Sequence, residues 1–179
     1  TAASVARNFS FVLPTRKMVD AIYDQSNSRF TPQPLPASPE MTSIAYFQHH
    51  NALIDQQAQT RRLPPAGALA GGHKKDVVLT NWLRRNPGHI AIYGWHRSTG
   101  DPIQPLSTVH GANYADYSHG VRLIGLDIEV GGKPTPLADA VVDRRLSALV
   151  TREAPFSEFT QVAPGLGSEH GVTVASARD

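Results

Sequence analysis

The chain has 179 residues, of which 40% are hydrophobic and 18% charged, and it holds 14 glycines and 14 prolines. This composition predicts one folded, loop-rich domain over residues 1–179. The net charge of +2 comes without a dense basic stripe, which argues against a nucleic-acid partner, and the absence of cysteine excludes disulfides, thiolate ligands and cysteine nucleophiles. No apolar run approaches the roughly 18 residues that a membrane-spanning helix needs. The first residues, Thr1 to Ala3, are typical of a chain left by signal-peptide removal, so we expect a secreted or periplasmic protein.

The first third of the chain predicts two helices joined by an extended segment. Residues 9–13 form a short, strand-like apolar run, after which Thr15 can cap a helix. Residues 31–39 contain four prolines, which predicts an extended connector across the surface. A second helix is expected over about residues 39–59, with a wide apolar face in which His50 points inward. This histidine is either hydrogen-bonded within the core or supports a site from behind.

The middle of the chain predicts a helix followed by a hairpin. We favour a helix over residues 76–83 because its apolar residues recur at four-residue steps, although a strand over 76–80 is the alternative. Residues 89–96 and 102–109 alternate between apolar and polar and are separated by turn residues, which predicts a β-hairpin.

The last third predicts a strand, a helix and a tail. Residues 120–130 give the strongest strand pattern, with a bulge at Gly125. A helix follows over residues 136–150, and residues 154–179 form a loosely held tail with an edge strand near 171–175. The whole order predicts an α+β fold, in which a small, mainly antiparallel sheet packs against several helices and loops are abundant.

One run, residues 71–122, contains five of the eight histidines. Hydrogen-bonding side chains crowd between Tyr114 and Arg122, and this density predicts a polar pocket rather than a simple surface loop. The candidate catalytic residues are His73, Lys75, His110, Tyr117, Ser118, His119 and Arg122.

Roles for these residues follow from side-chain chemistry. His110 or His119 would act as a general base. Arg122 and Lys75 would bind negative charge, since a guanidinium offers a planar fork to a carboxylate or phosphate. Tyr117 would orient a histidine or the substrate.

A zinc centre is the first of three chemistries that this run can support. His96, His110 and His119 would coordinate zinc and leave a fourth position for an activated water. Asp116 or Asp127 would hold a ligand ring from behind. The usual pairs of closely spaced zinc-binding histidines are missing, so a site without any cofactor stays open.

The other two chemistries need no metal. In one, a histidine works with a lysine or aspartate as acid and base, and Arg122 stabilises developing charge. Ser118 activated by His110 as a nucleophile is one version of this chemistry. In the other, Tyr93, Trp95 and neighbouring tyrosines form a binding platform without turnover. A purely structural polar network is the remaining interpretation.

Four phrases, GGHKKDVVL, IAIYGWH, PIQPLSTVHG and YADYSHGVRLIG, together resemble a family of uncharacterised exported bacterial proteins over residues 9–150. The resemblance implies export and implies that His73 to Arg122 form one site. It implies no particular reaction.

A second resemblance is partial. His110-Gly111, Ser118-His119-Gly120 and Arg122-Leu123 resemble the HG…SHGCxRL signature of L,D-transpeptidases, β-rich enzymes that cross-link peptidoglycan through a cysteine thioester. Val121 stands where that cysteine should be, the interval between the two parts is shorter, and one residue is missing before the arginine. The thioester route is therefore closed, and the resemblance implies only cell-wall material as a substrate.

These observations together predict an exported hydrolase that acts on an anionic peptide or glycan polymer, with cell-wall material as the leading candidate, through a histidine-rich site. Its cofactor is either none or zinc. The alternative is a cell-wall or polysaccharide binding module that uses the same pocket without catalysis.

Overall fold

A computed structural model describes residues 2–60 and 69–157 of the chain. Its centre is an open four-stranded sheet in the order β5-β4-β3-β6. β4 pairs antiparallel with β3 and with β5, and β3 pairs parallel with β6. The predicted α+β fold is confirmed. The sheet strands are β3 (Lys75–Val77), β4 (Ile92–His96), β5 (Pro102–Ser107) and β6 (His119–Gly120).

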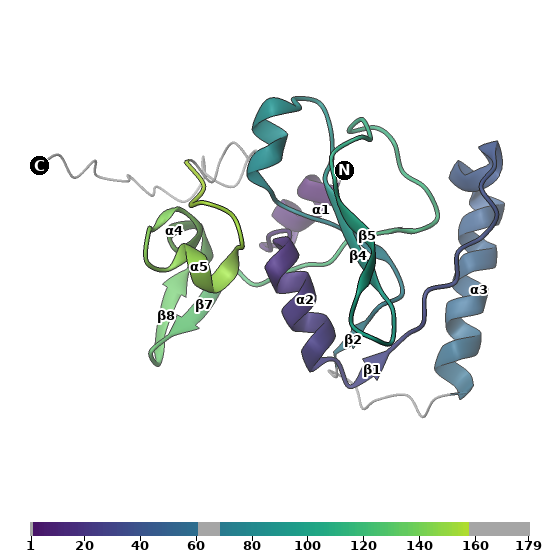
Figure 1. The fold of residues 1–179 in the computed structure, drawn as a ribbon, viewed down its shortest axis with the longest axis horizontal. Coiled ribbons are helices and arrows are strands. Elements are labelled where there is room, and N and C mark those ends of the chain that lie inside the picture. The colour runs from purple at the N-terminus through teal and green to yellow at the C-terminus, as the bar shows by residue number, and fades with distance from the viewer. Residues whose placement is uncertain (1, 61–68, 158–179) are drawn as a thin grey trace, which may run out of the picture.

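Two small ladders and several helices surround this sheet. β1 (Ser28–Arg29) pairs parallel with β2 (Ala70–Gly71), and β7 (Asp127–Val130) forms a hairpin with β8 (Lys133–Pro136). Figure 1 shows α2 and α3 on opposite sides of the sheet, and α4 and α5 gathered with β7 and β8. The helices are α1 (Ala2–Asn8), α2 (Arg16–Gln25), α3 (Ile44–Thr60), α4 (Leu137–Val142) and α5 (Ser147–Val150), with 3-10 turns η1 (Pro39–Thr42) and η2 (Asn81–Arg85).

Helix α2 begins where its cap was predicted. The Thr15 side chain accepts a hydrogen bond from the backbone N–H of Met18, at 3.3 Å, and so satisfies one of the unpaired donors of the first turn. Val19 and Tyr23 are buried, and Val19 packs against Tyr93 of β4. The predicted hairpin is also confirmed, as β4 and β5.

The helix predicted over residues 76–83 is wrong, and the alternative strand is closer to the structure. β3 lies inside the sheet and pairs with a strand on each side, so its backbone forms hydrogen bonds with two neighbouring strands. Val77, Val78 and Leu79 are all buried, which is typical of a strand covered on both faces. The apolar residues of 76–83 are therefore closely spaced because both faces of the strand are buried, and not because they line one face of a helix.

The single strand predicted over residues 120–130 is also wrong. β6 ends at Gly120 and β7 begins at Asp127, in a different sheet. Between them Ile124 exchanges two backbone hydrogen bonds with Val12, of 2.9 and 2.8 Å, so the N-terminal segment pairs where the strand would have continued. The strand-like run over residues 9–13 reduces to this one bridge and follows helix α1.

Two predicted helices differ from expectation in detail. The helix over 39–59 starts as a 3-10 turn, and its predicted apolar face is largely open, since only His50 is buried and Ile44 is 77% exposed. The helix over 136–150 divides into α4 and α5 at Asp143, whose carboxylate accepts two backbone N–H groups of the following turn. Of the tail predicted over 154–179, only residues 154–157 lie within the described residues, and the edge strand near 171–175 lies outside them.

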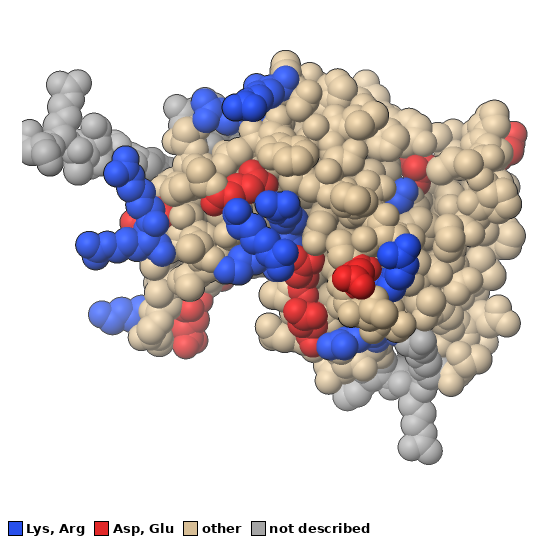
Figure 2. Space-filling model, in the orientation of Figure 1, with Lys and Arg blue, Asp and Glu red and all other residues tan. Residues whose placement is uncertain are grey.

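None of the helices in the described ranges is long and apolar enough to cross a membrane. Charged side chains are spread unevenly on the face seen in Figure 2. They gather over the half of the molecule that holds α2, α4 and α5, where acidic and basic groups are mixed, and few lie over α3.

Strand β4 changes phase near its end. Gly94 and Trp95 both have left-handed backbone, with φ of 109° and 58°, and the register with β5 shifts after Ile92. In a regular strand residues 93 and 95 would share a face. Here Tyr93 and His96 both contact α2, whereas Trp95 lies against α3. The bulge therefore places His96 on the same side of the sheet as Tyr93 and leaves Trp95 on the opposite side.

Asp20 of α2 joins three parts of the chain. Its Oδ1 accepts hydrogen bonds from the Tyr93 hydroxyl at 2.8 Å and from His96 Nε2 at 2.9 Å, and its Oδ2 pairs with Arg152 at 3.0 Å. His96 is buried and stacked on Tyr23, with ring centroids 4.6 Å apart. Burial acts to raise the pKa of Asp20, but the hydrogen bonds from His96 and Tyr93 and the charge of Arg152 hold it below its ordinary value.

We expect Asp20→Ala to lower the free energy of unfolding by about 2–4 kcal/mol, because buried partners lose their acceptor. Since the folded-state pKa is lowered, this contribution is present above the unfolded-state pKa of about 3.9 and is lost as the pH falls further. Urea denaturation at pH 7 and pH 3 measures both effects. Asp24→Ala, an exposed aspartate of the same helix, is the matched control and should change stability by less than about 0.5 kcal/mol. Equal stabilities of the two variants would contradict the role given to Asp20.

Candidate metal centre

The loop between β5 and β6 carries the densest group of functional side chains. At its start the His110 carbonyl accepts from the backbone N–H of Ile90, at 2.9 Å. At its end the Ser118 carbonyl accepts from the backbone N–H of Lys75, at 2.8 Å, and His119 enters β6. Because both ends are tied to the sheet, the loop brings two histidines that are nine positions apart next to each other.

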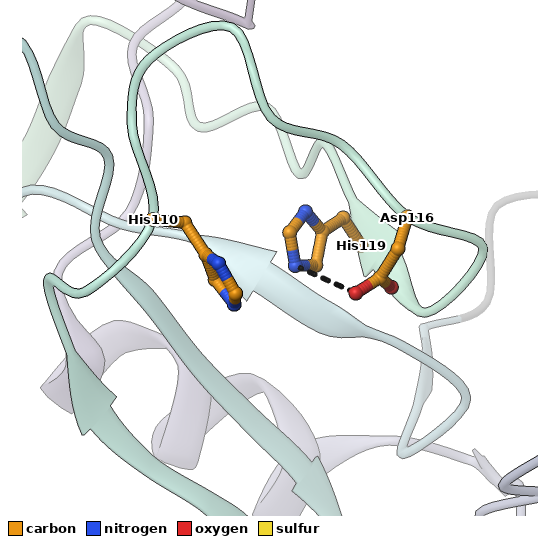
Figure 3. Close-up of side chains that lie close together, drawn as sticks. All are labelled: His110, Asp116 and His119. Carbon is orange, nitrogen blue, oxygen red and sulfur yellow. Dashed lines mark ion pairs between the residues drawn. The ribbon is translucent and has the colours of Figure 1, made fainter. Parts of the chain in front are cut away.

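His110, Asp116 and His119 form a cluster in which one ligand atom of each residue lies within 4.8 Å of the others. The His119 Nε2 is 3.6 Å from Asp116 Oδ2, and the two imidazole centroids are 5.6 Å apart. Figure 3 shows the His119 ring between the other two side chains. Tyr114 stacks on His110, with centroids 4.3 Å apart, and so limits how that ring can turn.

Asp116 is 1% exposed and is held by its own loop. Its Oδ1 accepts from the backbone N–H and the hydroxyl of Ser118, at 2.8 and 2.5 Å, and its Oδ2 accepts from the Tyr114 hydroxyl at 3.2 Å. Burial acts to raise the pKa of Asp116, but the bonds from Ser118 and the charges of His119 and Lys75 hold it below its ordinary value. The group is therefore an oriented carboxylate, as a metal ligand requires.

His119 is the residue that most needs an additional partner. Its side chain is 6% exposed, and neither ring nitrogen has a hydrogen-bond partner among the described residues. Burial lowers the pKa of His119 to about 4, against the opposing charge of Asp116, so the imidazole is neutral at pH 7. A buried nitrogen left unpaired costs free energy, and a neutral imidazole is the form that binds metals. Two imidazoles and one carboxylate therefore fit a divalent transition metal such as zinc or iron.

The structure does not bring His96 to this cluster. It lies at the end of β4 that pairs with the start of β5, whereas His110 follows the end of β5 and lies beside Ile90. Its Nε2 is bound to Asp20. Asp116, expected to support a zinc ligand from behind, lies where it could itself supply the third ligand, and Asp127 is exposed on the separate β7–β8 hairpin.

Two predicted site residues lie together at a different place. Arg122 Nε donates to Asp76 Oδ2 at 3.0 Å, and its Nη2 donates to the Ala70 carbonyl at 3.3 Å. Arg122 and His73 line a cavity of about 400 Å³ beside β6. The charge of Arg122 is therefore neutralised by a buried carboxylate. The residues from His73 to Arg122 do not form one site, because Arg122 and His73 lie at this cavity and not in the cluster of His110, Asp116 and His119.

Ser118 is arranged as a donor to Asp116. It is fully buried, and its hydroxyl proton is directed to the carboxylate rather than to His110. This geometry does not support the serine-nucleophile version of the chemistry. It supports a role for Ser118 in orienting the carboxylate.

Tyr117 and Lys75 lie next to the cluster. The Tyr117 hydroxyl accepts from the Leu35 backbone N–H at 2.7 Å, so it fastens the loop to the proline-rich segment 31–39. Lys75 faces His119 across the β3–β6 ladder, and its Nζ lies 5.2 Å from the centroid of the Trp95 ring.

Comparisons of this chain with family models, with curated proteins and with solved structures found no match. Sequence reasoning had not proposed Asp116 as a ligand. The available signal was the three-residue step from Asp116 to His119, which a single turn brings together.

Three histidines are expected to make stability depend on pH. Burial lowers the pKa of His50, His73 and His119 to about 4. Because these values lie below the unfolded-state value of about 6.5, the stabilisation is fully present above pH 6.5 and is lost as the pH falls towards 4. In that range each histidine changes the free energy of unfolding by up to about 1.4 kcal/mol per pH unit.

Urea denaturation of metal-free protein at several pH values measures this slope. His119→Gln should remove the contribution of one histidine from the pH dependence of the unfolding free energy, because a neutral side chain replaces a titrating one. An unchanged slope in this variant would show that His119 is not held neutral in the folded protein.

Proposed function

We propose that this protein is a metal-dependent hydrolase whose centre is formed by His110, Asp116 and His119. The observation that carries the proposal is the pair of buried His119 nitrogens, which have no hydrogen-bond partner among the described residues and lie beside an oriented carboxylate and a second imidazole. Zinc is the first choice because this set of ligands is common at catalytic zinc sites, where three protein ligands leave one position open.

The protein's own residues have distinct tasks in this proposal. His110 and His119 supply neutral nitrogen ligands, and Asp116 supplies a charged oxygen ligand that Ser118 and Tyr114 hold in place. A bound zinc ion acts as a Lewis acid and lowers the pKa of water. Lys75, which interacts electrostatically with both Asp116 and His119, adds positive charge at the edge of the centre.

The proposed substrate is an anionic peptide or glycan polymer, with cell-wall material as the leading candidate, and the proposed location is secreted or periplasmic. The positive charge of Lys75 and the partial resemblance of residues 110–123 to a peptidoglycan-processing signature support this choice. The alternative is a cell-wall or polysaccharide binding module in which the same cluster holds a metal without turnover.

Metal analysis of protein purified without a histidine tag tests the centre. We expect about one equivalent of zinc or iron per chain, and mass spectrometry of the eluted metal distinguishes the two. Asp116→Asn and His119→Ala should weaken binding of added zinc by at least about tenfold, because each removes or neutralises a ligand. His49→Ala, an exposed histidine of α3, is the control and should bind as the native protein does. A native protein that takes up no zinc from micromolar solution would contradict the centre.

Release of soluble fragments from peptidoglycan or an acidic polysaccharide tests turnover. We expect His110→Ala to reduce the rate by at least about a hundredfold, since a missing ligand disturbs the centre directly. His49→Ala should leave the rate unchanged. If native protein binds the polymer and releases nothing, the binding-module alternative replaces the hydrolase.

A further inference from the structure

A second group of unusual side chains surrounds the indole ring of Trp95. This residue is 4% exposed, and its Nε1–H is buried without a hydrogen-bond partner in the described part of the chain. The imidazole of His50 lies with its centroid 6.0 Å from the ring, and Lys75 Nζ lies 5.2 Å from the ring centroid. An indole N–H can only donate, so this group lacks an acceptor.

His50 adds a second unpaired donor. Its Nδ1 lies 3.0 Å from Lys74 Nζ, and an ammonium group can only donate, so Nδ1 must accept. Burial, together with the charge of Lys74, lowers the pKa of His50 to about 4, so the ring is neutral and carries its proton on Nε2. This Nε2–H is also buried and has no partner within residues 2–60 and 69–157.

Lys75 is the cation of this region whose N–H donors have no acceptor among the described residues. Lys74 Nζ donates to the Tyr117 carbonyl at 2.5 Å and contacts His50, and Arg122 is paired with Asp76. For Lys75 Nζ, the described residues provide a contact with the Trp95 ring and no hydrogen bond or ion pair. Its side chain is half-buried, so a ligand can approach from solvent.

The backbone supports a functional reading of this arrangement. Trp95 has a φ of 58°, a left-handed conformation that a bulky residue adopts only under constraint. Such strain tends to be kept where it positions a functional group. Here it places the indole next to both Lys75 and His50.

We propose that Trp95 Nε1, His50 Nε2 and Lys75 Nζ form a binding site for an anionic group, a carboxylate or a phosphate. Three donors, one of them charged, match the several acceptor oxygens of such a group. Because Lys75 faces His119 in the β3–β6 ladder, the site borders the metal centre. The statement that the anion belongs to the substrate rests on the proposed function, whereas the binding site itself does not.

Calorimetric titration with sodium phosphate and with sodium acetate tests the site, using full-length protein in metal-free and in zinc-loaded form. In metal-free protein we expect Lys75→Met to weaken binding of the preferred anion by at least about tenfold, because one charge-assisted hydrogen bond is lost. Trp95→Phe should weaken it by about fivefold, as loss of one neutral donor. Lys75→Arg, and Lys133→Met at the exposed start of β8, should stay within about twofold of native protein.

The outcomes separate the two proposals. Tighter binding of phosphate than of acetate, or the reverse, identifies which anion the site takes. Anion binding that depends on Lys75 in a protein that takes up no zinc would sustain the site and remove the metal centre. Equal affinities of native and Lys75→Met protein, with the same melting temperature, would overturn the anion site, and Lys75→Arg with weakened binding would do so as well.

Discussion

The left-handed pair Gly94–Trp95 is the constraint on which the arrangement of the functional groups depends. Without the phase change, the last residues of β4 would alternate regularly and Trp95 would point towards α2 with Tyr93. With it, His96 joins Asp20 and Tyr93 on the α2 side, and Trp95 joins His50 on the α3 side. Glycine at position 94 makes this possible, because a Cβ there would lie 3.2 Å from Val19 and the backbone has a positive φ.

The two sides of the sheet consequently hold polar groups of different character. On the α2 side Asp20 has its partners, and the network fastens a helix to a strand. On the side of the β5–β6 loop, the described residues offer no hydrogen-bond partner to either buried nitrogen of His119, nor to the buried N–H groups of Trp95 and His50. A folded protein keeps few such groups unless something binds them. The buried nitrogens of His119, His50 and Trp95 are the physical reason for placing the two proposed ligands, a cation and an anion, beside these residues.

Local signals predicted the parts of the fold that local interactions decide. The Thr15 cap and the turn residues of the hairpin act over a few positions, and α2, β4 and β5 form where expected. The strand at β3 was only the alternative to a helix, because pairing with two strands distant in sequence overrides the helical spacing of its apolar residues. His96 was grouped with the other histidines because it lies in the same histidine-rich run, but its end of β4 pairs with the start of β5, away from His110. His110 and His119 meet through hydrogen bonds from Ile90 and Lys75 that no short-range pattern reveals.

The central claim is that His110, Asp116 and His119 share one metal ion. X-ray absorption at the zinc edge of zinc-loaded, untagged protein tests it most directly, because the spectrum reports the atoms bound to the ion. The account predicts two imidazole nitrogens and at least one carboxylate oxygen at about 2.0–2.2 Å. A spectrum with a shell of water oxygens only, or one that is the same in Asp116→Asn and His119→Ala, would contradict it.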